Sequence, residues 1–126
     1  RSFYVNDRLD LDLLRKVSSD LIGTHDFAAF TKAHSKNKTT ICTITKAEWE
    51  EQNELLIFRI SADRFLWNMV RAIVGTLLEI GLHKRPADDL QRVMKSGKRT
   101  NAGASVPAAG LFLTEVEYPK GSFKFD

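Results

Sequence analysis

The sequence predicts an α+β protein built as a two-layer α/β plait, a variant of the ferredoxin-like arrangement with a mainly antiparallel sheet and helices on one face. Two observations support this fold class. Three segments repeat their apolar residues at helical spacing, and three short runs are rich in β-branched or apolar residues, in the order α-β-β-α-α-β. Helices covering one face of an antiparallel sheet form a stable two-layer architecture for this order. The length of 126 residues suits a single domain at 1–126.

The first predicted helix covers residues 10–22, where leucine and valine recur at helical spacing, an aspartate can cap the start and Gly23 can end it. The segment THDFAAF at 24–30 predicts a single packed turn, because its two phenylalanines lie three residues apart. The segment TKAHSKNK at 31–38 is polar and basic, which predicts an exposed loop.

Two strands are expected next. Residues 40–49 contain the β-branched run TICTIT, and residues 55–62, LLIFRISA, are strongly apolar. The polar EEQNE between them, at 50–54, predicts a hairpin turn. A last strand is expected at 111–118, LFLTEVEY, where Pro119 ends it.

Two helices are expected between the second and the last strand. The first is FLWNMVRAIVGTLLEIG at residues 65–81. The other begins near Pro86, a favourable first helical residue, carries aspartates in its first turn and ends at Gly97. The 65–81 run is too short for a bilayer and contains Asn68 and Arg71, so we reject a membrane span.

Composition narrows the classes of function. Cys42 is the single cysteine, which excludes an internal disulfide and favours a reducing cytoplasm. A net charge of +3 permits a polyanionic partner without indicating one. No metal-ligand spacing, phosphate-binding loop or dinucleotide fingerprint occurs, so we expect neither a metal nor a cofactor. The first residue is Arg1 rather than methionine, so we expect a processed chain or a fragment.

The position of Arg71 in the apolar 65–81 run is open to two interpretations. A helical wheel places one set of residues toward the core: Leu66, Met69, Val70, Ile73, Leu77 and Ile80. Arg71 falls on the opposite arc, together with Asn68, Ala72, Gly75 and Glu79. This arc is either a solvated outer face or, with Trp67 and Leu78 at its edges, one wall of a cleft.

Four segments spread over most of the chain carry motifs in a fixed order. They are GTHDFAAF at 23–30, FLWNMVRAIVGTLLEIG at 65–81, the RTNAG loop that begins at Arg99, and PAAGLFLTEVEYP at 107–119. In these motifs and spacings the chain resembles the C-terminal domain of the tRNA pseudouridine synthase A (TruA) family.

The resemblance implies an enzyme that isomerises uridine to pseudouridine in the anticodon stem-loop of tRNA, without cofactor or metal. The C1′–N1 bond breaks and C5 of the base joins the sugar. The essential aspartate of the family belongs to a G-R-T-D-x-G-V-H-A motif of the N-terminal domain, which this sequence lacks. The resemblance therefore implies that the chain is inactive alone, works with the N-terminal domain of the same parent chain and binds tRNA. The full-length parent protein is expected to be a cytoplasmic homodimer, and whether this chain dimerises by itself is left open.

One segment is similar to the missing G-R-T-D-x-G-V-H-A motif. Residues 97–103, GKRTNAG, place Asn101 near the position of the aspartate. An amide carries no negative charge and cannot act as nucleophile or base in that role. We interpret the likeness as coincidence.

The resemblance also assigns a role to Arg71. It matches the arginine of the family's M-V-R segment, which is expected to pair with the catalytic aspartate across the domain interface. A guanidinium holds a carboxylate in a fixed orientation and keeps it ionised.

Further candidates come from loops, helix ends and the last strand. For contacts with RNA phosphates we consider Arg99, Lys98, Lys95, Lys36, Lys38, Lys32 and His25, against the alternative of an ordinary solvated basic surface. His25 and Asp26 are also expected to fix the turn before Phe27 by capping and hydrogen bonding. For the uridine pocket we consider Phe65, Gly110 and Leu111, with Met69 assigned to the core.

Two other functions remain as alternatives. A self-sufficient RNA-binding α/β module would present aromatic residues on adjacent strands, and the strands offer Phe58 and Phe112 without a basic-aromatic string. A small-molecule regulatory domain of plait fold is the other alternative, which the basic loops do not favour.

Overall fold

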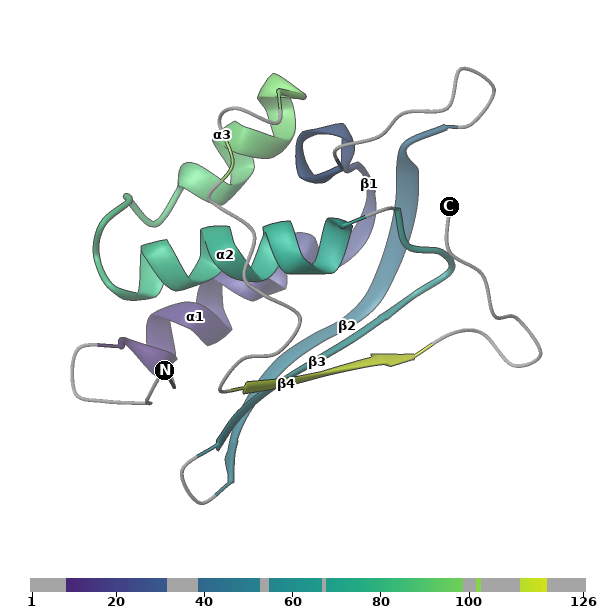
Figure 1. Cartoon of the computed structure of the whole chain (residues 1–126). Coiled ribbons are helices and arrows are strands. Elements are labelled where there is room, and N and C mark those ends of the chain that lie inside the picture. The colour runs from purple at the N-terminus through teal and green to yellow at the C-terminus, as the bar shows by residue number, and fades with distance from the viewer. Residues whose placement is uncertain are drawn as a thin grey trace.

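The computed structural model describes residues 9–31, 39–52, 55–66, 68–98, 102 and 112–117, the last of these as backbone only. Figure 1 shows its elements along the chain, which are α1 (Leu11–Ser18), η1 (Ser19–Leu21), β1 (Gly23–Asp26), η2 (Ala28–Phe30), β2 (Ile41–Gln52), β3 (Leu55–Ala62), α2 (Met69–Gly81), α3 (Asp89–Ser96) and β4 (Phe112–Glu117).

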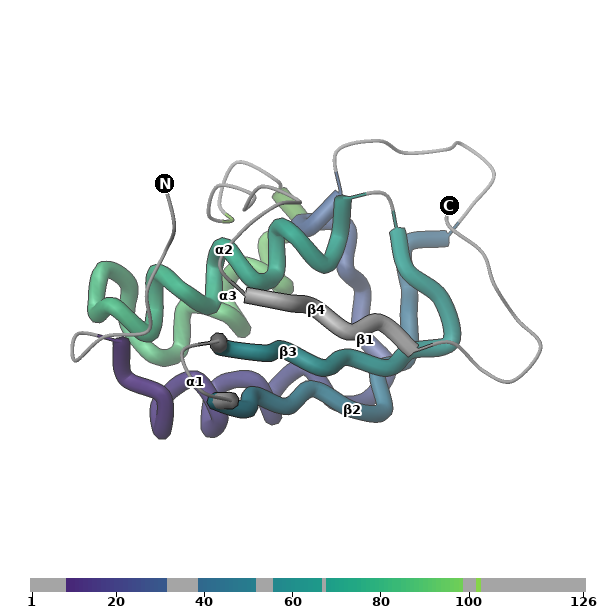
Figure 2. Tube along the Cα trace, turned by 60° about the horizontal axis from the view of Figure 1, so that its bottom comes forward, coloured from purple at the N-terminus to yellow at the C-terminus, as the bar shows by residue number. Residues whose placement is uncertain are grey.

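The four strands form one sheet in the order β1-β2-β3-β4. β1 pairs with β2 and β2 with β3 in antiparallel fashion, whereas β4 runs parallel to β3. Helices α2 and α3 lie in the connection between these parallel strands, as a parallel pair requires. Figures 1 and 2 show the helices on one side of the sheet. The predicted α+β class, with a mainly antiparallel sheet, is confirmed.

The first strand was not predicted. The expected packed turn at 24–30 is right for Ala28–Phe30, a 3₁₀ turn, and wrong for the residues before it. Gly23–Asp26 pairs with Ile44–Ile41 of β2 and adds an edge strand, so the order is α-β-β-β-α-α-β. Four residues with little β-branching carry no strand signal of their own, and the exposed edge of β2 supplies the hydrogen bonds.

β2 is longer than its sequence pattern indicates. Of the predicted turn EEQNE, the residues up to Gln52 continue the strand, and residues 53 and 54 lie outside the described ranges. The side chains that face the core are Cys42, Ile44, Ala47 and Trp49, so the alternation breaks once. A β-bulge between Ile44 and Lys46 accounts for the break, because one extra residue restores apolar side chains to the core face.

The predicted boundaries of α1 and α3 need correction at one end each. α1 ends at Ser18, and the η1 turn continues to Leu21. α3 begins at Asp89 rather than near Pro86, although Gly97 ends it as predicted, with a left-handed φ of 64°. At the start of α1 the Asp10 carboxylate accepts a hydrogen bond from the Leu13 N–H at 3.0 Å, as a capping residue does.

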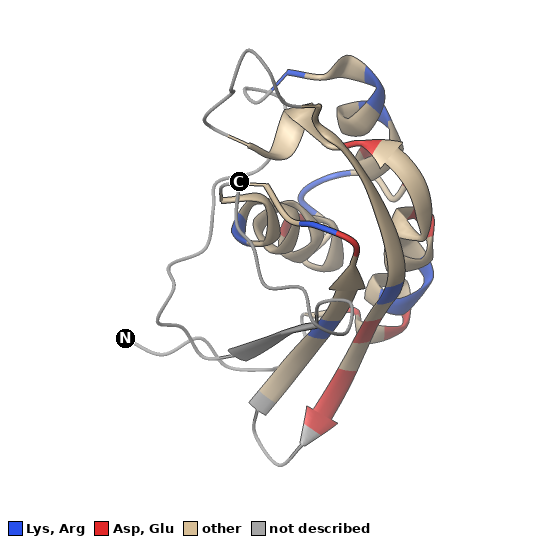
Figure 3. Ribbon diagram, turned by 90° about the vertical axis from the view of Figure 1, so that its right-hand side faces the viewer, with Lys and Arg blue, Asp and Glu red and all other residues tan. Residues whose placement is uncertain are grey.

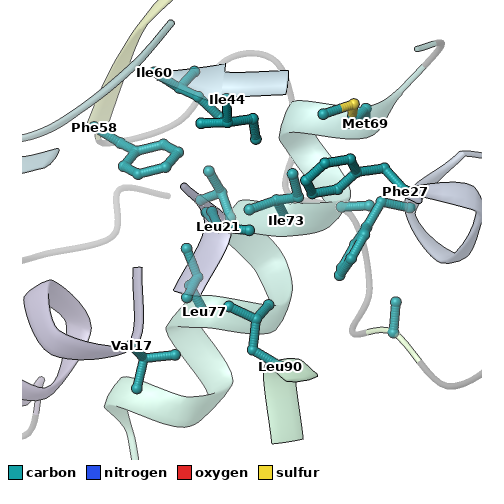
Figure 4. Packing of buried hydrophobic residues seen from close by; sticks show 14 of the residues in the cluster. Val17, Leu21, Phe27, Ile44, Phe58, Ile60, Met69, Ile73, Leu77 and Leu90 are labelled. Carbon is teal, nitrogen blue, oxygen red and sulfur yellow. The ribbon is translucent and has the colours of Figure 1, made fainter. Parts of the chain in front are cut away.

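α2 is the central helix of the core. It packs against α1, α3 and η2, and Figure 4 shows Ile73 and Leu77 among side chains from α1, α3 and the sheet. Consequently Ala72 and Gly75, which the helical wheel placed on the outer arc beside Arg71, are buried, and that part of the prediction is wrong. Contacts on several sides of α2 leave little of its surface to solvent. None of the helices in the described ranges has the length and apolarity to cross a membrane.

Candidate functional site

The N-terminal end of α2 carries the residue of greatest interest. The helix begins at Met69 rather than at Phe65, because Asn68 adopts a left-handed conformation with φ 65° and ψ 5°. The carbonyl of Asn68 accepts the first i→i−4 hydrogen bond, from the Ala72 N–H at 3.1 Å. Residues 65 and 66 therefore precede the helix and do not share its wheel.

Arg71 lies in the first turn of α2 and its side chain is exposed. The helix contains one other charged residue, Glu79, which accepts a hydrogen bond from Arg85 Nε at 2.6 Å. The residues next to Arg71 are the half-buried Val70 and the fully buried Ala72. Arg71 is therefore exposed at the protein surface on a well-packed helix.

Of the residues considered for the uridine pocket and its surroundings, some are described by the structure and others are not. Phe65 is 1% exposed and belongs to the core, so its ring does not line an open surface. Met69 is fully buried, which confirms its assignment to the core. Gly110 and Leu111 lie outside the described residues, as does Trp67.

The basic candidates on α3 are exposed. Lys95 lies in the last turn of the helix, and Lys98 follows the Gly97 cap with its N–H donating to Ser96 Oγ at 3.2 Å. The other candidates for RNA contact lie outside the described residues: Arg99, Lys36, Lys38 and Lys32.

His25 and Asp26 hold the chain around the η2 turn, as expected. The Asp26 Oδ1 atom accepts hydrogen bonds from the Ala28 N–H at 3.0 Å and from the Thr40 hydroxyl. The His25 Nε2 atom lies 2.9 Å from the Ile22 carbonyl oxygen, and its ring meets Phe27 edge to face at 5.9 Å. Both residues therefore have a structural role, which leaves contact of His25 with RNA a prediction.

Tertiary contacts bring the elements that carry Arg71, Lys95 and His25 to one end of the molecule. α3 contacts both β1 and η2, and η2 contacts α2. Figure 4 shows Phe27 beside Met69 and Ile73 of the first half of α2. In Figure 3, basic residues are marked along α3 at the top, whereas acidic residues are marked on β2 toward its hairpin end. The acidic residues of this end are Glu48, Glu50 and Glu51.

Arg85 connects the last turn of α2 to the first turn of α3. Its Nε donates to Glu79, and its Nη1 donates to Asp89 Oδ2 at 2.9 Å. Partial burial acts to lower the pKa of Arg85, and the hydrogen bonds and charges of Glu79 and Asp89 outweigh that effect, so the pKa is raised. The pair of helices that carries Arg71 and Lys95 is thereby tied together at the opposite end.

Two shallow hollows occur away from this end. Each has a volume of about 510 Å³, and the walls of both include Asp10 and His83. His83 Nε2 lies 3.2 Å from Asp10 Oδ2. Within the described part of the chain, no three His, Cys, Asp or Glu side chains are grouped so as to hold a metal ion.

Comparison with known proteins decides the family. The family model described as tRNA pseudouridine synthase matches residues 17–119. The chain belongs to the tRNA pseudouridine synthase family. It is 43% identical over 118 residues to a tRNA pseudouridine synthase A of Acetivibrio thermocellus, covering 94% of this chain and 48% of that protein. The corresponding protein of Bacteroides fragilis is 43% identical over 123 residues, covering 97% of this chain and 49% of that protein. The chain thus spans about half the length of these relatives.

The pseudouridine synthase chain contains structural features that its sequence pattern did not reveal. The left-handed Asn68 and the Arg85 ion pairs are the main ones. For Asn68 a sequence signal was available, because Asn tolerates left-handed conformations better than most residues. The Glu79–Arg85 ion pair joins a helix end to a loop, so its spacing along the sequence does not match the helical spacing that would predict a pair.

Proposed function

We propose that this chain is the C-terminal half of a tRNA pseudouridine synthase that converts uridine to pseudouridine in the anticodon stem-loop of tRNA. The other half of the parent protein would supply the catalytic aspartate, so the chain alone is inactive. We further propose a cytoplasmic homodimer of the parent protein. The shared family and the coverage of about half of each relative support this assignment.

The exposure of Arg71 carries the proposal for the site. Arg71 is exposed on a helix whose other residues are mostly buried, so it lies on a surface that another domain can cover. Once the two domains exclude water, hydrogen bonds from the guanidinium to both carboxylate oxygens orient that group and lower its pKa. The aspartate then stays ionised and positioned for its attack or proton transfer on the sugar.

The arrangement of charge supports a site for tRNA near α3. Exposed Lys95 and Lys98 lie where α3 approaches η2 and β1, and the acidic end of β2 lies elsewhere. Lysine contacts to phosphates position RNA without reading its sequence. We assign the same role to Arg99, Lys36, Lys38 and His25.

The test uses the full-length protein and tRNA labelled with tritium at C5 of uridine, since pseudouridine formation releases that tritium. We expect turnover by the wild-type protein and none by the 126-residue chain alone. Arg71→Ala is expected to lose about 3–5 kcal/mol of transition-state stabilisation, as when one partner of a buried ion pair is removed. Arg71→Lys is expected to recover little, because an ammonium lacks the planar fork.

The matched control is Lys16→Ala, which removes an exposed positive charge from α1. It should leave turnover near the wild-type value. Turnover by the isolated chain would contradict the division of the site between two domains. Wild-type turnover in the Arg71→Ala protein would contradict the assignment of Arg71. Tight, salt-insensitive and sequence-selective tRNA binding by the chain, without turnover by the full-length protein, would favour a self-sufficient RNA-binding module.

A further inference from the structure

The start of α2 is set by a single backbone conformation. The apolar pattern continues from Phe65 into the helix, yet the helix begins at Met69 because Asn68 has φ 65°. A left-handed conformation costs most residues about 1–2 kcal/mol and is tolerated by Asn and Gly. A helix cannot extend through such a residue, so Asn68 decides which residue forms the first turn.

A compact turn from Leu66 to Met69 accompanies this conformation. The Met69 N–H donates to the Leu66 carbonyl at 3.1 Å, as in a β-turn whose third residue has positive φ. The Leu66 N–H donates in turn to Met69 Sδ at 3.5 Å. Leu66 is 6% exposed and Met69 is fully buried, so the thioether is the acceptor for a buried N–H.

Met69 also fastens this turn to the sheet. Its Sδ atom lies 4.0 Å from the thiol sulfur of Cys42, a buried residue of β2. Figure 4 shows its side chain close to Phe27. The beginning of α2 is therefore held on the strand side by Met69 and on the helix side by the Asn68 carbonyl, which accepts from Ala72.

Arg71 follows this anchored turn by two residues. A shift of the helix register by one residue at this turn would rotate its side chain by about 100° around the helix axis, the angle between successive residues. We propose that Asn68 and Met69 are positioning residues for Arg71, which fix the direction of its guanidinium through the Leu66–Met69 turn. This inference rests on the proposed function, because it concerns the orientation of Arg71 toward the catalytic carboxylate.

The test compares two substitutions of Asn68 in the full-length protein. Asn68→Gly keeps the left-handed conformation accessible, whereas Asn68→Val makes it unfavourable because a β-branched residue is an outlier at positive φ. We expect Asn68→Gly to keep the wild-type kcat. We expect Asn68→Val to lower kcat by about 100-fold, the effect of misplacing a catalytic group by about 1 Å, with KM for tRNA unchanged.

A second pair of variants tests the role of the Met69 sulfur atom as a hydrogen-bond acceptor. Met69→Leu keeps volume and removes the acceptor of the Leu66 N–H, and Met94→Leu is the control, since Met94 packs at the edge of the core on α3. We expect Met69→Leu to lower kcat by about tenfold, because one of the two bonds of the turn is lost. We expect Met94→Leu to leave kcat unchanged. Thermal unfolding of each variant verifies that the assay temperature lies in the folded range.

Three outcomes would overturn the proposal. The first is a kcat of Asn68→Gly as low as that of Asn68→Val, which would show that the Asn68 side chain matters rather than its conformation. The second is wild-type kcat in both Asn68 variants. The third, decisive if Asn68→Val does not fold, is the same kcat in Met69→Leu and Met94→Leu. Failure of the proposed function itself is distinguishable, since the wild-type full-length protein would then release no tritium.

Discussion

The indole N–H of Trp49 donates a hydrogen bond to Ser18 Oγ at 2.7 Å, and both residues are buried where α1 crosses β2. This bond joins the end of the first helix to the middle of the sheet. The Arg15 Nε group adds a weaker link by donating to the Trp49 carbonyl at 3.4 Å. The pair thus contributes to the docking of α1 on the sheet.

Ser18→Ala is predicted to destabilise the protein. The substitution leaves the buried indole N–H without its acceptor, which costs about 1–3 kcal/mol in the free energy of unfolding. Chemical denaturation measures this loss. The matched control is Ser19→Ala, because the Ser19 side chain is exposed and donates to the Lys16 carbonyl of its own turn. In the background of Trp49→Phe, which has no N–H to satisfy, Ser18→Ala should cost much less. An equal cost in both backgrounds would contradict the role of the bond.

Arg85→Ala is predicted to destabilise the junction of α2 and α3. The Arg85 and Asp89 side chains are 21% and 17% exposed, so this pair lies between a surface and a buried ion pair. We expect a loss of about 1 kcal/mol in the free energy of unfolding, above the value of fully exposed pairs. Arg92→Ala is the control, since Arg92 is 62% exposed, and should change stability by less than about 0.5 kcal/mol.

The pH dependence of the Arg85 contribution follows from the direction of its pKa shift. The folded-state pKa of Arg85 is raised, so its charge stabilises the fold fully below the unfolded-state pKa and loses this effect only as pH rises through the folded value. Both values lie in the strongly alkaline range. The difference in unfolding free energy between wild type and Arg85→Ala should therefore show no arginine titration near neutral pH, and a step there would contradict the prediction.

His83→Gly is predicted to stabilise the end of α2. His83 has a φ of 62°, and the N–H groups of His83 and Lys84 donate to Ile80 and Glu79 as in a Schellman motif, which favours glycine at this position. Relief of the left-handed strain is worth about 1 kcal/mol, and the exposed contact with Asp10 that is lost is worth less. His83→Ala loses the contact and keeps the strain, so its midpoint of thermal unfolding should fall below those of wild type and His83→Gly.

Lys95→Ala and Lys98→Ala are predicted to weaken tRNA binding by the full-length protein. Each loss of a phosphate contact should reduce the slope of log affinity against log salt by about 1. Lys16→Ala on α1 is the control, because Lys16 is also exposed and lies on a helix that packs mainly against α2 and β2. Binding titrations at several salt concentrations measure the slopes. Equal slopes in all three variants would remove α3 from the RNA-binding surface.

Several features of this protein were decided by local sequence. Asp10 caps α1 and Gly97 ends α3, as their residue types predict, because a cap depends on a few neighbouring backbone groups. β3 covers the predicted residues 55–62, since a run of apolar residues that long suits a central strand. The motifs at 23–30, 65–81, 99–103 and 107–119 together suggested the family that the comparisons confirm.

Other features were decided only by tertiary structure, because they depend on residues that are distant along the chain. The strand Gly23–Asp26 exists because β2 offers a free edge, and the bulge after Ile44 returns apolar residues to the core. Ala72 and Gly75 are buried because neighbouring elements surround α2. At the start of α2, the Met69 sulfur accepts a hydrogen bond from the Leu66 N–H and lies against Cys42 of β2, a contact between residues far apart along the chain. The sequence determined that an arginine lies within an apolar helix, and packing of the surrounding elements buried Ala72 and Gly75 beside it while Arg71 stays exposed.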